Sequence, residues 1–385
     1  MGKVEMERVR AVERYSRGES ASAISASIGR SVRWVYKWIE RSAEGGEWWT
    51  EHSRKPHRTG NRSSPEVERL IVEARRRLVS EGGFEGAQMI AWELENAAIA
   101  VPSIATINRV LKRHGLIESA GRRPVSKGKR YPAPEAVHAG VHQSDFVGPR
   151  FLRGPVRFYS LNTVDVAPAR CATVPIPNRS TEAVVPALWE TWLRLGIPRI
   201  QQLDNELVFF GSRLYPRGLS QVLRLCLLHD VAPLFIPPSE PWRNGVIEKF
   251  NDHWQQKFLT QPMSTLAEAQ DRSRAFDERH NSRWRYRKIG GKTPNEALRA
   301  GRISPQMPPQ IAPPSLPLPR PKRGRYHFIR FIRSDRLLDL FGEKFALPAE
   351  AAHEYVQATV DVETQRLDIR IDQQLIETFH YAAPK

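Results

Sequence analysis

The spacing of hydrophobic side chains divides the chain into three parts. Up to about residue 117, apolar residues recur at the three- and four-residue spacing of helices. Between residues 141 and 260, short apolar runs typical of strands alternate with helical patterns. After residue 325, apolar and polar residues alternate as they do in strands. The pattern predicts a multidomain chain, with all-α helices first, an α/β core in the centre and β-structure at the end.

The first helical unit is predicted over residues 1–50. Ser20 and Ser31 each precede an apolar stripe and can cap a helix, and Gly29 turns the chain between the two helices. Helix, short helix, glycine turn and helix is the helix-turn-helix pattern. The alternative is a purely structural bundle with a solvated basic face. The basic residues of its third helix that we expect to contact DNA are Arg33, Lys37 and Arg41.

A second helix-turn-helix unit is predicted over residues 63–118. Pro65 stands at the first position of a helix, and Ser103 caps the last helix of the unit. A basic linker is expected over residues 119–138, with no pattern that decides whether it contacts DNA. The residues of the last helix that lie off its apolar stripe and are expected to contact DNA are Arg109, Lys112 and Arg113.

The central part, residues 139–300, reads as a sheet crossed by helices. Three strands are joined by short turns containing Pro155 and Pro168, so they are expected to form an antiparallel meander. Two further strands follow helical segments and are expected to be parallel. This order describes an α/β sheet of the ribonuclease H-like kind. The predicted strands are residues 142–147, 156–165, 170–176, 199–205 and 232–236.

Charge and composition limit the class of protein. The chain has 59 Lys and Arg against 42 Asp and Glu, a net charge of +17 that points to a polyanionic partner such as nucleic acid. A basic surface without such a partner is the alternative. Two cysteines are too few for a disulfide scaffold or a Cys-rich zinc module. With no apolar run of about 20 residues and no apolar N-terminal segment, we expect no membrane partner and a cytoplasmic, nucleoid-associated protein.

Three acidic residues fall within blocks of sequence that resemble a known family. Asp145, Asp204 and Glu248 lie at the edges of predicted strands and helices. Their surroundings resemble the three catalytic blocks of the DDE transposase and retroviral integrase family, and two later blocks resemble its downstream signature. The blocks are residues 143–146 (QSDF), 203–205 (LDN), 244–251 (NGVIEKFN), 280–283 (HNSR) and 292–298 (KTPNEAL).

The resemblance implies a metal-dependent site. In that family Asp145 would bridge two Mg²⁺ ions, Asp204 would complete one site and Glu248 the other, with Mn²⁺ able to substitute. Two such ions activate the attacking oxygen and stabilise the leaving oxygen of a phosphodiester. Taken one at a time, each of these three acids also has a simpler explanation, as a solvated residue or as a residue that caps a loop or helix. Asp165 also lies on a core strand and is expected to be structural.

Two departures from the family pattern are visible. Asp204 and Glu248 are separated by 43 residues, more than is usual in the family, with the extra residues within 208–220. That loop is expected to contact DNA or to cover part of the site. Glu206 stands where the family usually has glycine, so a fourth carboxylate either perturbs the metal site or faces solvent.

The last part of the chain begins with a basic, aromatic stretch. Trp284 and Tyr286 alternate with cations, a pattern that suits a DNA backbone with stacked bases, or a tail packed by its aromatics. Eight of the 17 residues from Pro305 to Pro321 are proline, so residues 302–324 are expected to be a stiff linker. Residues 325–385 are expected to form a small β-barrel that binds DNA or another subunit. The expected DNA-binding cations before the linker are Arg283, Arg285 and Arg287.

The sequence therefore predicts an insertion-sequence transposase of the DDE type. Its expected partners are double-stranded DNA, both as terminal inverted repeats and as target, and further copies of itself on that DNA. No nucleotide-binding loop of the Gly-x-x-x-x-Gly-Lys-Ser/Thr kind occurs, so ATP is not implied. The alternatives are a ribonuclease H-like nuclease that cuts without joining, and a catalytically silent DNA-binding regulator.

Overall fold

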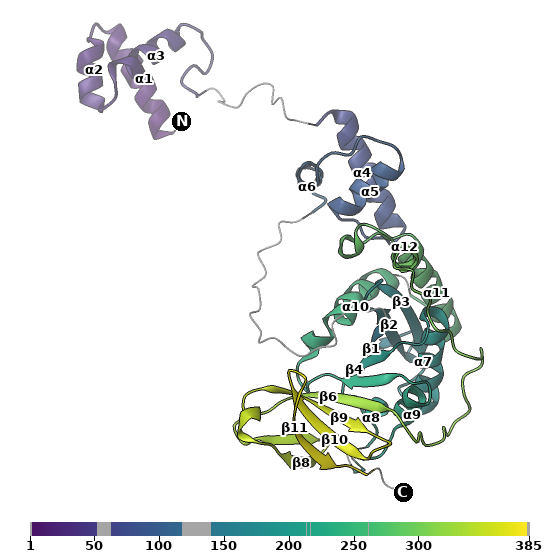
Figure 1. Ribbon diagram of the computed structural model, residues 1–385. Coiled ribbons are helices and arrows are strands. Elements are labelled where there is room, and N and C mark those ends of the chain that lie inside the picture. The colour runs from purple at the N-terminus through teal and green to yellow at the C-terminus, as the bar shows by residue number, and fades with distance from the viewer. Residues whose placement is uncertain are drawn as a thin grey trace. The chain divides into compact units, whose positions relative to one another are not determined.

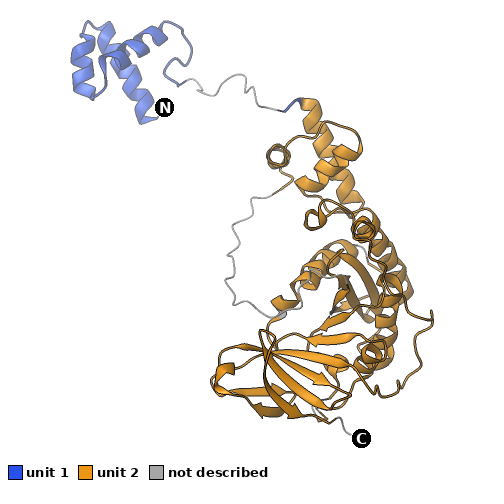
Figure 2. Ribbon diagram, in the orientation of Figure 1, with its two compact units in different colours: residues 1–64 blue, residues 65–385 orange. Residues whose placement is uncertain are grey.

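The protein forms two compact units, Met1–Ser64 and Pro65–Lys385 (Figure 2). A computed structural model describes residues 2–51, 63–117 and 140–382, apart from 213, 216 and 261. The predicted basic linker at 119–138 lies outside these ranges. Among the described residues, no helix has the length and apolar character needed to cross a membrane.

The first unit is a three-helix domain with a helix-turn-helix. Ser20 accepts a hydrogen bond from the backbone N–H of Ala23, and Ser31 accepts one from Trp34, both at 3.2 Å. Gly29 ends the second helix in the left-handed conformation, with φ +67°. The predicted caps and turn are therefore present. The helices are α1 (Lys3–Ser16), α2 (Ala21–Ile28) and α3 (Val32–Ser42), packed around Ile24, Val35 and Trp38.

The second unit begins with three more helices. Their shared core contains Ile71, Ile90 and Leu111, all fully buried. The buried carboxylate of Glu68 pairs with Arg113 and with His114, so the end of the third helix is fixed to the first. The helices are α4 (Pro65–Ser80), α5 (Ala87–Asn96) and α6 (Ile104–Arg113).

A mixed β-sheet forms the centre of the second unit (Figure 1). As predicted, its first three strands form an antiparallel meander, with His142 opposite Asp165. The fourth strand runs parallel to the first, and the fifth runs parallel to the fourth. This is the predicted ribonuclease H-like arrangement. The strands are β1 (Val141–Phe151), β2 (Arg157–Asp165), β3 (Arg170–Ile176), β4 (Ile200–Leu203) and β5 (Ala232–Phe235).

Helices bury both faces of this sheet. One hydrophobic core contains Trp192 and Leu225 with Phe235 of β5. Another contains Trp254 and Phe276 and continues into the core of α4–α6. The helical segments are α7 (Thr181–Leu195), α8 (Leu207–Phe210), α9 (Gln221–Leu228), η1 (Pro241–Asn244), α10 (Gly245–Phe258), α11 (Leu266–Ser282), η2 (Arg287–Ile289) and α12 (Pro294–Ala300).

The C-terminal strands extend the central sheet, and the small β-barrel predicted for residues 325–385 does not form. The described strands follow the open order β11-β10-β9-β6-β5-β4-β1-β2-β3, with β7 and β8 as a separate pair. Leu234 and Phe235 of β5 pair in parallel with His327 and Phe328 of β6. Alternation predicts strands but not their partners, and here the open edge of β5 supplies one. The elements are β6 (Arg325–Phe331), β7 (Leu337–Leu340), β8 (Glu343–Ala346), η3 (Ala349–Ala351), β9 (Tyr355–Asp361), β10 (Arg366–Ile371) and β11 (Gln374–His380).

The proline-rich segment before β6 follows the surface of two helices. Trp189 of α7 donates its indole N–H to the carbonyl of Ile311 at 3.2 Å. Gln221 and Arg224 of α9 bind the backbone N–H and carbonyl of Leu318, at 2.6 and 2.8 Å. The segment therefore carries the chain along α7 and α9 to the open edge of β5.

Polar side chains of α11 cover the outer edge of β3. Asn281 accepts from the N–H of Cys171 at 2.9 Å and donates to its carbonyl at 2.8 Å. Asp277 accepts from the N–H of Thr173 at 2.8 Å, and Ser273 donates to the carbonyl of that residue at 2.9 Å. These residues are spaced by four along one helix face, so a single helix binds the groups that a further strand would otherwise pair with.

Candidate active site

The strand register brings the first two predicted acids to neighbouring positions. Gln143 of β1 pairs with Gln202 of the parallel strand β4. Asp145 and Asp204 each lie two residues further along, so Asp145 on β1 and Asp204, which directly follows β4, occupy corresponding register positions. Their roles as catalytic residues stay a prediction.

Two glutamines fix the start of the helix that carries the third acid. Gln143 accepts a hydrogen bond from the backbone N–H of Ile247 at 3.1 Å. Gln202 donates to the side-chain oxygen of Asn244 at 3.0 Å and to the carbonyl of Arg243 at 3.2 Å. Glu248 lies in the first turn of α10. Hydrogen bonds from β1 and β4 therefore fix the turn that carries it.

The electrostatics indicate one acidic cluster that includes Glu206. The pKa of Asp145 is raised to about 6, mainly by burial and to a smaller extent by the charges of Glu248 and Glu206, while hydrogen bonds oppose the shift. Burial raises the pKa of Asp204 to about 7, with added repulsion from Asp145 and Glu206. The pKa of Glu248 is also raised, first by burial and then by Asp252. Burial is the main cause of each shift, and the contributions from neighbouring carboxylates indicate that these groups lie close enough to repel one another.

The chemistry of this cluster suits a hard divalent cation. Carboxylate oxygens are the ligands that Mg²⁺ prefers, and a cation among them would offset their repulsion. In their present conformations, no three His, Cys, Asp or Glu side chains of the described part of the chain are placed to hold a metal ion together. The role of the acids as ligands therefore stays a prediction.

Asn251 is a site residue that the sequence analysis did not single out. Its side-chain N–H donates to Asp145 at 2.8 Å, and its oxygen accepts from Asn162 at 2.8 Å. Asn162 in turn accepts from Ser160 at 2.6 Å. Asn251 lies three residues after Glu248, a spacing that puts both side chains on one helix face, so this signal was available in the sequence.

The additional carboxylate of Glu206 is paired with a cation. Arg179 forms an ion pair with Glu206 and lies over the ring of Tyr159, 5.2 Å from its centroid. The backbone N–H of Glu206 donates to Asp204 at 3.0 Å. Glu206 thus contacts the site through both its backbone and its charge.

The loop at 208–220 contacts the C-terminal segment. Phe210 stacks on Phe341 with ring centroids 3.6 Å apart. Arg217 forms an ion pair with Glu343 of β8 and lies over the ring of Tyr381. The described part of the additional sequence between Asp204 and Glu248 therefore joins the central sheet to the last strands.

Asp165 lies outside the acidic cluster. It is buried at the end of β2, with its carboxylate 4.0 Å from the imidazole of His142. Burial raises its pKa to about 6, and Arg170 opposes that shift. None of the four clustered acids contributes to this shift, which is consistent with the structural role expected for Asp165.

The predicted DNA-binding cations differ in how they are held. On α3, Arg33 is exposed, whereas Lys37 pairs with Glu51 at 2.8 Å and Arg41 donates to the carbonyl of Thr50 at 3.1 Å. On α6, Arg109 and Lys112 are exposed, whereas Arg113 pairs with buried Glu68. Exposed cations on each unit therefore remain open to a phosphate backbone.

The basic, aromatic stretch after α11 packs against α4–α6. Arg283 pairs with Glu81 at 2.7 Å, and Arg285 pairs with Glu95 at 2.9 Å. Trp284 is buried against Phe84, with ring centroids 5.0 Å apart. Arg287 is exposed. Two of the three predicted contacts are thus ion pairs within the protein, as in the alternative of a tail packed by its aromatics.

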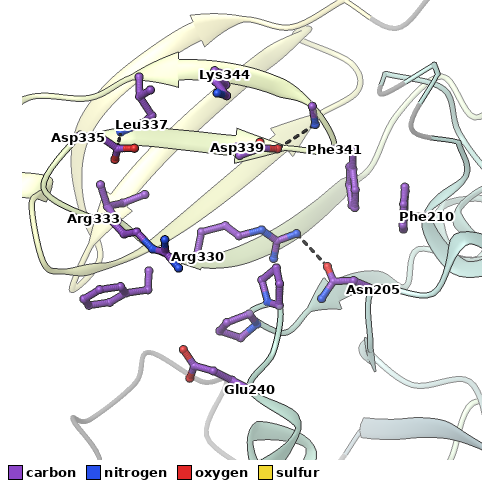
Figure 3. Close-up of a pocket in the computed structure, with 15 residues that line it drawn as sticks. Asn205, Phe210, Glu240, Arg330, Arg333, Asp335, Leu337, Asp339, Phe341 and Lys344 are labelled. Atoms are coloured by element: carbon purple, nitrogen blue, oxygen red, sulfur yellow. Dashed lines mark hydrogen bonds between the residues drawn. The ribbon is translucent and has the colours of Figure 1, made fainter.

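A cleft of about 780 Å³ adjoins Asn205, the neighbour of Asp204 (Figure 3). Its walls come from the segment before η1 and from β6–β8. Arg330 extends across it to Asn205, and Arg333 and Lys344 line its outer part. The cleft therefore lies between the Asp204 loop and the C-terminal strands.

Comparison with known proteins gives two family matches. Residues 3–47 match a homeodomain-like domain, and residues 229–294 match an integrase core domain. The second match includes Glu248. The solved structures that resemble the chain include the catalytic core domain of BIV integrase, at 16% identity and a TM-score of 0.33, covering 43% of this chain and 97% of that one.

Two other solved structures are similar at the same low level. The HTLV-2 integrase catalytic core domain in complex with magnesium is 15% identical over 41% of this chain and 95% of that one, with a TM-score of 0.30. A simian T-cell lymphotropic virus intasome in complex with PP2A regulatory subunit B56 gamma is 13% identical over 74% and 88%, with a TM-score of 0.36. The two sequence matches show that the chain contains a homeodomain-like domain at residues 3–47 and an integrase core domain at residues 229–294, which supports its resemblance to the DDE transposase and integrase family.

Proposed function

We propose that the chain is a DNA transposase that hydrolyses a phosphodiester at each end of a mobile element and joins the freed 3′-hydroxyl to target DNA. The observation that carries this proposal is the acidic cluster. Asp145 of β1 and Asp204, which directly follows β4, lie at corresponding register positions, the charge of Glu248 raises the pKa of Asp145, and the charge of Asp145 raises the pKa of Asp204. A family match to an integrase core supports it.

Each acid has a defined part in the proposed chemistry. Asp145, Asp204 and Glu248 would together hold the divalent cations, because their charges raise the pKa values of Asp145 and Asp204 and a bound cation would offset that repulsion. Asn251 holds one oxygen of Asp145 in place. The chemistry supplied by bound Mg²⁺, or by Mn²⁺ in its place, is activation of the attacking oxygen and stabilisation of the leaving oxygen.

The substrate is proposed to be double-stranded DNA. The exposed cations Arg33, Arg109, Lys112 and Arg287 are suited to phosphate contacts, which position a protein on a duplex. Two element ends must be processed together, so we expect further copies of the chain on the DNA. Such contacts would give an affinity that falls with salt concentration.

The experiment is a nicking and joining assay on DNA that carries the gene's own flanks, with Mg²⁺ or Mn²⁺. Wild type is compared with Glu248→Gln, and Asp271→Asn is the control because it removes an exposed carboxylate from α11. Metal-dependent joining is expected from wild type and from Asp271→Asn, and none from Glu248→Gln.

Other results would select a different function. Cutting without joining would indicate a ribonuclease H-like nuclease. Tight DNA binding without any cleavage would indicate a regulator. Equal joining by wild type and Glu248→Gln would remove Glu248 from the mechanism.

A further inference from the structure

Arg330 of β6 reaches from the C-terminal strands to the loop that follows Asp204. Its side chain is only 6% exposed. Its guanidinium donates to the side-chain oxygen of Asn205 at 2.9 Å and to the carbonyl of Ile236 at 3.1 Å. Asn205 donates to that same carbonyl at 2.7 Å. Hydrogen bonds therefore join Arg330 and Ile236, the residue after β5, to Asn205, which is next in sequence to Asp204; Figure 3 shows the bond between Arg330 and Asn205.

The aromatic surroundings leave this guanidinium little freedom. It lies 5.2 Å from the ring centroid of Phe328 and 5.8 Å from that of Phe341. A planar guanidinium group that is held between two aromatic rings presents its N–H groups in one fixed direction. A lysine ammonium, being a single point on a flexible stem, would not reproduce the two contacts.

A second contact from the C-terminal strands reaches the segment before Glu248. The hydroxyl of Tyr355, at the start of β9, donates to Glu240 at 2.8 Å. Arg243 of η1 donates to the same Glu240 at 2.9 Å and to the Tyr355 oxygen at 3.1 Å. The carbonyl of Arg243 accepts from Gln202 of β4. Tyr355 thus fixes η1, which leads directly into α10.

We infer that the last strands of the chain are part of the active-site scaffold, with Arg330 and Tyr355 as positioning residues for the Asp204 loop and the Glu248 helix respectively. The inference rests on the proposed function for its catalytic meaning and adds two residues to it. It assigns to the C-terminal segment a role other than the DNA or subunit contact expected from its sequence. The hydrogen bonds described above join Arg330 to the site through Asn205 and Tyr355 to the site through η1.

The test is hydrogen–deuterium exchange of the full-length protein, which reads local order whether or not the chain is an enzyme. Arg330→Met should speed exchange in residues 205–211 by about tenfold or more, the effect of losing a charge-assisted hydrogen bond on a local opening equilibrium. Tyr355→Phe should speed exchange in residues 243–248 by a similar factor and leave the exchange rate of residues 205–211 unchanged. Arg333→Met is the matched control, since it removes the same charge from an exposed position of the same cleft.

Two further variants keep the test decisive. If Arg330→Met unfolds the whole second unit, Asn205→Ala removes the same hydrogen bond from the other side and should loosen the same peptide. Arg330→Lys should recover less than half of the protection from exchange that Arg330→Met loses, because a single ammonium group cannot make both hydrogen bonds of the guanidinium group. Unchanged exchange in residues 205–211 in both Arg330→Met and Asn205→Ala would overturn the inference.

An activity measurement then separates positioning from DNA binding. In the joining assay, Arg330→Met and Tyr355→Phe should lower the rate at least tenfold at saturating DNA and leave the affinity for DNA within about twofold. A loss confined to DNA affinity would also overturn the inference. If wild type itself does not join DNA, the proposed function fails, and the exchange experiment still decides whether the last strands order the two segments.

Discussion

At the scale of single residues, Asn251 connects two of the candidate ligands. It shares a helix face with Glu248 and holds Asp145 at 2.8 Å. Asn251→Ala should lower the joining rate by about tenfold, since the carboxylate loses a charge-assisted hydrogen bond that fixes its direction. Gln256→Ala, at an exposed position of α10, is the control and should retain the wild-type rate. An unchanged rate in Asn251→Ala would show that Asp145 needs no such support.

His280 makes the stability of the second unit sensitive to acid. Burial lowers its pKa to about 4, because its ring lies among Phe250, Trp284 and Tyr286. The folded state therefore binds fewer protons than the unfolded state between pH 6.5 and 4, and this contribution to stability is lost as the pH falls through that window. Between pH 7 and 5 the loss is about 2 kcal/mol for this one residue.

Urea denaturation of His280→Gln at pH 7 and pH 5 checks this. The variant should be less stable than wild type at pH 7, and the gap in free energy of unfolding should narrow by about 2 kcal/mol at pH 5, because the variant has no imidazole to protonate. The exposed His380, replaced by Gln, serves as control and should give nearly the same free energy as wild type at both pH values. A gap that stays constant with pH would contradict the prediction.

At the scale of elements, the sequence predicted most segments and few of their partners. The sequence predicted a strand at residues 170–176, where the structure has β3 at Arg170–Ile176, because a short apolar run next to a turn is typical of a buried strand. The pairing of β5 with β6 could not be read in this way, since strand alternation carries no information on which edge a strand will meet. The acids were visible because their blocks are local in sequence. Arg330 and Tyr355 were not, because their contacts to the site cross about a hundred residues.

The cover that α11 provides for β3 is an element-scale feature with a measurable cost. Asp277→Ala leaves the N–H of Thr173 without its acceptor and leaves Arg194, which lies 2.9 Å from the carboxylate, without that partner. Removing one member of a buried ion pair costs on the order of 3 kcal/mol. Chemical denaturation should show a loss of this size. Asp271→Ala, on the exposed face of the same helix, should change stability by less than about 0.5 kcal/mol.

At the scale of the whole molecule, removing the first unit and removing the last strands should have different effects on folding. A chain of residues 65–385 should fold and keep its cooperative unfolding transition, because its cores are contained in that unit. A chain of residues 65–301 should lack that transition and aggregate, since removing β6 exposes the edge of β5 and the face of Phe235 that stacks on Phe328. Calorimetry and gel filtration of both chains test this. A soluble, cooperatively folded 65–301 would show that the central sheet is complete without its last strands.

The strand order also makes the proposed DNA cutting depend on synthesis of the chain through its last strands. Leu234 lies 93 residues before its partner His327. At translation rates of about 5–20 residues per second, the edge of β5 therefore remains unpaired for roughly 5–20 seconds before β6 has been synthesised. A truncated messenger RNA that ends between the codons for these two residues yields a protein that carries the helix-turn-helix unit and a sheet without β6 and the strands beyond it. Such a product would occupy element ends without cutting them and would compete with the full-length protein. Damage to the end of the gene would therefore convert a proposed transposase into its own inhibitor.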